Sequence, residues 1–336
     1  MNRYLDAIPH PWTREAIQQA IFTNFTEARE AIEDTPGGIF WRARLDLEDS
    51  LWMFDCSVTE LLDEIAVFGE RSQSPAFWQT ADADQADAHK RAVKRYIFNC
   101  TSSLMALVDH ARNFQTAYPV TGFRDHLQKC FRTPGLHSFL QCFRNYNTHW
   151  RVAEANWSIH SDFRSGHREA RFVVSKRELL RWNGWSASAR AYISAATDPI
   201  DIHATFAEYR RSAQDFYSWH RGAVLAQYSD TFRPYLEYKR LHQGVLKCLK
   251  WNALVSHAPK SVNPYTYIAQ YLSKAQLEAL LALEHGSEAQ VDALMNALGI
   301  GDFCCPELRR KVASFFESFG ATAPQVAQTG AASGGG

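Results

Sequence analysis

The sequence has no net charge, because 36 lysines and arginines balance 36 aspartates and glutamates. A protein that coats long nucleic acid carries a clear basic excess, so this balance argues against that class. A small phosphate-binding site needs only a few cationic groups, so the charge balance does not exclude one. No apolar run approaches the length of a bilayer span, and the N-terminus lacks the apolar core of a signal peptide. We therefore expect a cytoplasmic protein that makes no contact with a membrane.

Motifs for metal and nucleotide binding are missing as well. The chain contains no CxxC, no HExxH and no Cys/His set at zinc-finger spacing. It also contains neither GxGxxG nor a P-loop, which removes those routes to nucleotide binding. The seven cysteines are odd in number and widely scattered, as is typical of reduced thiols. We expect no metal and no cofactor, while a Cys/His nucleophile pair stays open.

Aromatic residues and helical periodicity are abundant. The 336 residues include 10 Trp, 13 Tyr and 21 Phe, enough for a sizeable core. Helical patterns cover residues 13–33 and 41–70, and a possible capping box at Ser57 and Glu60 predicts a restart inside the second pattern. A long helix ends at Pro119, and two or three more fill the C-terminal third. These patterns predict a mainly α fold.

A small β-hairpin interrupts the helices. Two short alternating stretches, 157–163 and 170–175, predict its strands.

A candidate capping box at Ser175 and Glu178 opens the next helix. Asp198-Pro199 opens a further helix. The apolar positions of that helix are Ile202, Phe206, Tyr209, Ala213, Phe216 and Val224.

We expect four regions along the chain, although no linker marks a firm boundary. Residues 1–85 form an N-terminal helical region, and residues 86–250 form a central helical bundle with the hairpin inserted. Residues 251–320 form C-terminal helices. Residues 321–336 contain small and polar residues with a single valine, which is typical of a flexible tail.

The most informative segment is residues 144–149, with the sequence RNYNTH. Thr133 is a good N-cap and Pro134 suits the first helical position, so we expect a helix from there to about Ala155. Six side chains form one apolar stripe that must face a core: Leu136, Phe139, Leu140, Phe143, Tyr146 and Trp150. Asn147 falls within this stripe and needs a buried hydrogen-bond partner.

The arginine and histidine of this segment lie away from the helix's own core. Asn145 and His149 are spaced i, i+4 on the far side, and Arg144 lies on the flank beside Thr148. An arginine can hold phosphoryl oxygens and a histidine titrates near neutrality, so the pair can bind a phosphodiester and move its protons without a metal. Two other interpretations stay open: a solvated polar face, or a packing interface with structural hydrogen bonds.

The bare spacing of Arg and His is weak evidence, because it occurs three times. The pairs are Arg3 with His10, Arg132 with His137, and Arg144 with His149. Pro9 interrupts the first pair and Pro134-Gly135 interrupts the second, so neither lies on one continuous helix. Only the third pair has a helix, an outward face and a polar neighbour.

With those features, the segment resembles the signature of the HEPN superfamily, in which a helix bears Arg, a polar residue and then His. Arg144, Asn145 and His149 match this pattern. RNYNTH followed by a hairpin and ELLRWNGW is also similar to bacterial RNYxxH proteins, and this likeness covers residues 87–235. The preceding helix, with LMALVDH at 104–110, fits the partner helix of an up-down bundle. One departure is that Trp150-Arg151 follows the motif in place of a Leu-Pro exit.

The resemblance implies an HEPN-like helical bundle that acts as a metal-independent endoribonuclease, with Arg144, Asn145 and His149 as catalytic residues. HEPN ribonucleases usually dimerise so that two motif helices form one composite site, which makes RNA and a second copy the implied partners. Thr148 and Asp109 are candidate substrate-binding residues, although Asp109 fits equally well as an exposed acid. The implied role is that of a toxin or phage-defence protein, with an antitoxin or regulatory partner as a further candidate. The alternative is a non-catalytic HEPN-like module for dimerisation or RNA binding.

Overall fold

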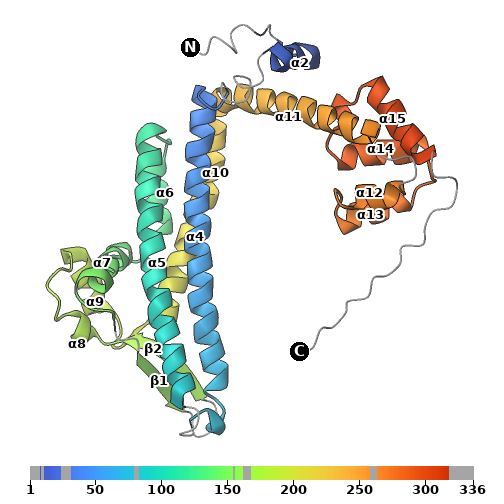
Figure 1. The fold of residues 1–336 in the computed structure, drawn as a ribbon. Coiled ribbons are helices and arrows are strands. Elements are labelled where there is room, and N and C mark those ends of the chain that lie inside the picture. Colours follow the sequence, from blue (N-terminus) through green and yellow to red (C-terminus); the bar gives the residue numbers. More distant parts are fainter. Residues whose placement is uncertain are drawn as a thin grey trace. The chain divides into compact units, whose positions relative to one another are not determined.

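The structure is a computed structural model, and it describes residues 8, 11–23, 32–78, 83–153, 156–161, 168–257 and 263–317 (Figure 1). The chain divides into two compact units, one of residues Ile39–Thr231 and one that combines Met1–Gly38 with Phe232–Gly336. These limits differ from the boundaries expected at residues 85 and 250, because the long helices on both sides of residue 85 belong to one unit. The expected tail lies outside the described residues.

The Ile39–Thr231 unit is mainly helical. Its helices are α4 (Pro36–Arg71, which begins just before the unit), η1 (Pro75–Trp78), α5 (Ala83–Ala117), α6 (Phe123–Cys130), α7 (Leu136–His149), α8 (Lys176–Leu179), α9 (Ala187–Ala195) and α10 (Ile202–Gln227). The predicted mainly α class with a small antiparallel sheet is therefore confirmed. Within the described residues, no helix is both long enough and apolar enough to cross a bilayer.

Three long helices, α4, α5 and α10, form the core of this unit. Phe40 of α4 packs against Phe114 of α5, with ring centroids 6.1 Å apart. Phe54 of α4 packs edge-on against Tyr209 of α10 at 5.8 Å. All six apolar positions predicted for α10 are buried: Ile202, Phe206, Tyr209, Ala213, Phe216 and Val224. The helical periodicity of the sequence thus identified the core face of α10 correctly.

A three-stranded antiparallel sheet adjoins these helices. Its order is β1 (Asn156–Ser161), β2 (Arg168–Val174) and β3 (Ile200–Asp201). Trp157 of β1 lies opposite Phe172 of β2. Phe172 is buried and packs on Phe68 of α4, with centroids 4.7 Å apart, so the hairpin is anchored to a long helix. The predicted strand pair is confirmed, and residues 162–167 between the two strands lie outside the described part of the chain.

Outside the helix predicted from Thr133 to about Ala155, two predicted helix starts are wrong, and a third lacks its predicted cap. α4 continues through Ser57, whose hydroxyl donates to a carbonyl one turn earlier at 2.9 Å and so caps no new helix. Asp198-Pro199 is followed by β3, and α10 begins only at Ile202. Asp201 is its N-cap and accepts a hydrogen bond from a backbone N–H at 2.9 Å. Ser175 does precede α8, but its side chain makes no capping hydrogen bond.

The second unit is also helical. Its elements are α2 (Arg14–Thr23), most of α11 (Ser229–His257), α12 (Pro264–Ala269), α13 (Lys274–Leu281), α14 (Glu288–Ala297), η3 (Gly301–Phe303) and α15 (Pro306–Glu317). The C-terminal third therefore has more helices than the two or three expected, because serine and asparagine caps restart the helix repeatedly. Ser273 forms a full capping box with Gln276 at the start of α13. Buried Gln290 of α14 donates to the Tyr265 hydroxyl of α12 at 2.9 Å and ties these short helices together.

Candidate functional site

Gly135 sets the start of α7, the helix that carries the sequence motif. Its φ of 79° lies in the left-handed region, which favours glycine. A Cβ at this position would lie 2.5 Å from the carbonyl oxygen of Ser188 and 2.9 Å from the Cβ of Tyr192, so a glycine lets α7 approach α9. The prediction of Thr133 as the N-cap is wrong. The Thr133 hydroxyl donates to the carboxylate of Glu208 in α10, and α7 begins later, at Leu136.

The predicted apolar stripe of α7 is buried except at its last position. The buried members are Leu136, Phe139, Leu140, Phe143 and Tyr146. Tyr146 packs against Trp182 and Trp185, with ring centroids 5.7 and 5.6 Å apart. Trp150, the predicted end of the stripe, is 43% exposed. This aromatic cluster fixes which face of α7 is covered and leaves the opposite face outward.

α7 ends at His149, short of the expected end near Ala155. Trp150 leaves the helical conformation, with φ −121° and ψ −60°. The side chain of Asn147 is buried, and its Oδ1 accepts a hydrogen bond from the N–H of Ala153 at 2.9 Å. The prediction that Asn147 needs a buried partner is confirmed, and this bond turns the following chain back onto the helix.

The motif side chains lie on the outward face of α7. Asn145, Thr148 and His149 are exposed, and Arg144 is half-buried. The Arg144 guanidinium donates to Oδ1 of Asn145 at 3.2 Å. The Thr148 hydroxyl donates to the backbone carbonyl of Arg144 at 2.8 Å. The structure therefore brings Arg144, Asn145 and Thr148 together, and His149 follows one helical turn after Asn145.

Arg144 has no acidic partner among the residues that the structure describes. Other partly buried arginines of the unit do have one. Arg210 donates to Asp55 through two atoms, at 2.7 and 2.9 Å. Arg44 lies 2.5 Å from Glu48, and even the exposed Arg151, two residues after the motif, lies 3.7 Å from Glu178. The Arg144 guanidinium keeps most of its five N–H donors available for an anion from outside the chain.

Asp109 lies apart from this cluster. It is on α5 and pairs with Arg112 of the same helix at 3.3 Å, and both side chains are more than half exposed. No hydrogen bond or ion pair within the described part of the chain joins Asp109 to α7. The structure therefore places Asp109 as an exposed acid, and its role in substrate binding stays a prediction.

The competing pair, Arg132 with His137, offers no equivalent site. Nδ1 of His137 lies 2.8 Å from the hydroxyl of Tyr209, which is buried in the core. Burial lowers the pKa of His137, and the positive charge of Arg112 lowers it further. His137 is therefore a neutral, hydrogen-bonded residue at neutral pH. The first pair, Arg3 with His10, lies outside the described residues.

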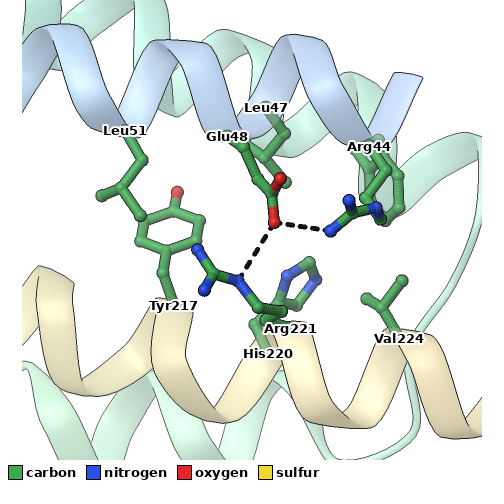
Figure 2. Close-up of a pocket in the computed structure, with 9 residues that line it drawn as sticks. Arg44, Leu47, Glu48, Leu51, Tyr217, His220, Arg221 and Val224 are labelled. Carbon is green, nitrogen blue, oxygen red and sulfur yellow. Dashed lines mark hydrogen bonds and ion pairs between the residues drawn. The ribbon is translucent and has the colours of Figure 1, made fainter. Parts of the chain in front are cut away.

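A second charged cluster lies between α4 and α10 (Figure 2). Figure 2 shows Glu48 between two guanidinium groups, with Arg44 at 2.5 Å and Arg221 at 3.0 Å. His220 lies beside them, and burial lowers its pKa to about 4. The space that these residues line has a volume of about 20 Å³, room for roughly one water molecule. Because the carboxylate is already paired, this cluster joins two helices and has no room for a substrate.

Neither a metal-binding cluster among the described residues nor a match to a known protein helps to define this site. In the described ranges, no group of three or more His, Cys, Asp or Glu side chains is arranged to hold a metal ion. Comparison with models of protein families, with curated proteins and with solved structures finds no match. The candidate site is therefore defined by the outward face of α7 alone.

One feature of the unit was not predicted from the sequence. Arg112, Arg124 and His137 line a large cavity bounded by α5, α6 and α10. No sequence motif marks it, because its residues come from four separate helices and meet only in the folded chain. The regular spacing of apolar residues on a helix predicts which face of that helix is packed. It does not predict a cavity between neighbouring helices.

Proposed function

We propose that this protein is a metal-independent endoribonuclease that cuts RNA with Arg144 and His149, in the manner of HEPN ribonucleases. The observation that carries the proposal is the half-buried Arg144 cation, which has no counter-ion within the described residues and lies on the same outward face as His149. A phosphodiester supplies the missing negative charge. The guanidinium fork matches two phosphoryl oxygens.

The chemistry needs only groups that the chain provides. The ribose 2′-hydroxyl attacks the adjacent phosphorus, and the bond from phosphorus to the 5′-oxygen breaks. A neutral His149 takes the proton of the 2′-hydroxyl, and a protonated His149 gives a proton to the leaving 5′-oxygen. Arg144 stabilises the charge that builds on the phosphoryl oxygens in the transition state. The products are a 2′,3′-cyclic phosphate and a 5′-hydroxyl, so DNA is not a substrate.

Asn145 acts as a positioning residue in this scheme. Its Oδ1 accepts the hydrogen bond from Arg144, which limits the directions that the guanidinium can take. The Thr148 hydroxyl donates its hydrogen bond to the Arg144 carbonyl. The lone pairs of the same oxygen are left to accept a hydrogen bond from the substrate.

A second copy of the chain completes the site in this proposal. One turnover needs a base and an acid, and a two-fold axis beside α7 supplies a separate histidine for each role. Two large apolar side chains directly after the motif support such a contact, since Trp150 is 43% exposed and Val152 is 49% exposed. Large exposed apolar groups beside a polar site are typical of an interface.

The test is cleavage of total cellular RNA in the presence of EDTA. The wild type and a matched control, His203→Ala, should cut RNA, because His203 is an exposed histidine of α10 away from the motif. His149→Ala and Arg144→Ala should not. Cleavage by His149→Ala at the parental rate would show that the assignment is wrong. RNA retention without cleavage by the wild type would favour the non-catalytic binding module.

The dimer has its own test. Light scattering at micromolar concentration should give twice the chain mass, and Trp150→Glu should shift the protein to a monomer with lost cleavage. A fully active monomer would contradict the composite site while leaving the roles of Arg144 and His149 intact. A toxin or phage-defence role, with an antitoxin or regulatory partner, would follow if expression of the wild type, but not of His149→Ala, stops growth.

A further inference from the structure

A cavity of about 680 Å³ lies among α5, α6 and α10 of the Ile39–Thr231 unit, with one side chain from α7. This volume lies within the range of pockets that bind small molecules. It is far larger than the space beside Glu48. Its lining residues span positions 107 to 217, so it forms only when these helices assemble.

The wall of this cavity is mainly apolar and aromatic. Phe131 packs against Tyr209 and Phe216, with ring centroids 5.1 and 6.2 Å apart. Leu107 and Ala213 extend the same surface. An apolar ligand body that covers this surface removes apolar area from water and so gains free energy.

The charged groups at the cavity have one sign. Arg112 and Arg124 both line it, and no aspartate or glutamate does so among the described residues. Arg124 is exposed and makes no ion pair in the described part of the chain. Arg112 pairs with Asp109, but both side chains are more than half exposed, and such a pair is weak enough for a ligand anion to replace it.

His137 adds a neutral polar group to this surface. Its Nδ1 shares a hydrogen bond with the Tyr209 hydroxyl at 2.8 Å. Its Nε2 has no hydrogen-bond partner among the described residues and remains available to a ligand atom. An apolar wall, two cations and a few neutral polar groups together favour one class of ligand.

We propose that this cavity binds an amphiphilic anion, in which a carboxylate or phosphate head contacts Arg112 and Arg124 and an apolar body covers Phe131 and Phe216. Neither half of such a ligand suffices. The head alone meets exposed arginines that salt screens, and the body alone makes no contact with either cation.

Isothermal titration with four probes tests this ligand class. Decanoate and decyl phosphate carry both parts, decanol lacks the charge, and inorganic phosphate lacks the apolar body. Decanoate and decyl phosphate should bind with one site per chain, at least tenfold more tightly than decanol or phosphate. Equal binding of decanol and decanoate would overturn the role of the arginines. Absence of binding by both amphiphiles would overturn the proposal.

Variants locate the site. Arg112→Gln with Arg124→Gln should weaken decanoate binding at least tenfold, while Arg91→Gln, an exposed arginine of α5 outside the cavity, should not. Ala111→Trp should fill the cavity and abolish binding, with circular dichroism showing that the variant is folded. Unchanged affinity in both the double variant and a folded Ala111→Trp would contradict the assignment. These measurements use neither Arg144 nor His149, so their outcome is independent of RNA cleavage.

Discussion

The guanidinium of Arg144 donates a hydrogen bond to Oδ1 of Asn145 at 3.2 Å, on the outward face of α7. This bond joins two neighbouring residues of the motif and leaves the rest of the guanidinium fork unoccupied within the described residues. The proposed function depends on that fork and not on positive charge alone.

Arg144→Lys should therefore lower the single-turnover cleavage rate by about 100-fold, although the charge is kept. A lysine ammonium has no planar fork, so it cannot hold two phosphoryl oxygens in one plane. Asn145→Ala should lower the rate less, because it removes only the orientation of the guanidinium. A rate for Arg144→Lys within twofold of the parent would contradict the role of the fork.

Asn147 should matter for stability and not for the chemistry. Asn147→Ala leaves the N–H of Ala153 buried without its acceptor, which should lower the free energy of unfolding by about 1–3 kcal/mol. Asn145→Ala, two positions earlier and exposed, is the matched control and should change it by less than about 0.5 kcal/mol. Urea unfolding measures both. Equal stability of the two variants would mean that the bond to Ala153 contributes nothing.

His220 makes the fold sensitive to acid. Burial against Phe114, Phe123 and Phe216 lowers its pKa from 6.5 to about 4. Between these values the unfolded chain binds a proton that the folded chain does not. The free energy of unfolding therefore falls as the pH drops below 6.5, and this loss is complete near pH 4. The loss amounts to about 3 kcal/mol.

His220→Phe should reduce this loss, because phenylalanine fits the same aromatic surroundings and has no proton to bind. Urea unfolding of parent and variant at pH 7 and pH 4.5 gives the comparison. His137 has a lowered pKa as well and contributes with the same sign in both proteins. An identical pH dependence of parent and variant would show that His220 is not the titrating group.

Cys305 should be the most reactive of the described thiols. Burial opposes its thiolate, but the N–H of Leu308 and the guanidinium of Arg14 outweigh burial and lower the pKa of Cys305. Burial raises the pKa of Cys100, which is fully enclosed. At neutral pH, iodoacetamide should label Cys305 first and Cys100 last, as read by peptide mass mapping. Faster labelling of Cys100 would contradict this order.

Helical periodicity predicted the fold class and the buried faces of α7 and α10, because a 3.6-residue repeat of apolar side chains follows directly from packing one helix face. It did not predict where α7 begins. Thr133 is a good cap in isolation, but its hydroxyl bonds to α10, and the contact of Gly135 with α9 fixes the start instead. Tertiary contacts decided that boundary.

The outward face of the candidate site was also predictable, since Asn145 and His149 fall opposite the apolar stripe. The missing counter-ion of Arg144 was not, because any acidic residue of the chain could in principle have folded against it. The cavity lined by Arg112 and Arg124 was equally hidden. It depends on how α5, α6 and α10 are spaced in the folded chain, and no local pattern encodes that spacing.

The most direct measurement compares one RNA with its 2′-O-methyl version at the position of cleavage, in EDTA. The proposed function predicts that the wild type cuts the unmodified RNA, leaves a 2′,3′-cyclic phosphate and a 5′-hydroxyl, and does not cut the methylated RNA at that position. His149→Ala should cut neither. Cleavage of the methylated position, or unchanged cleavage by His149→Ala, would contradict the central claim.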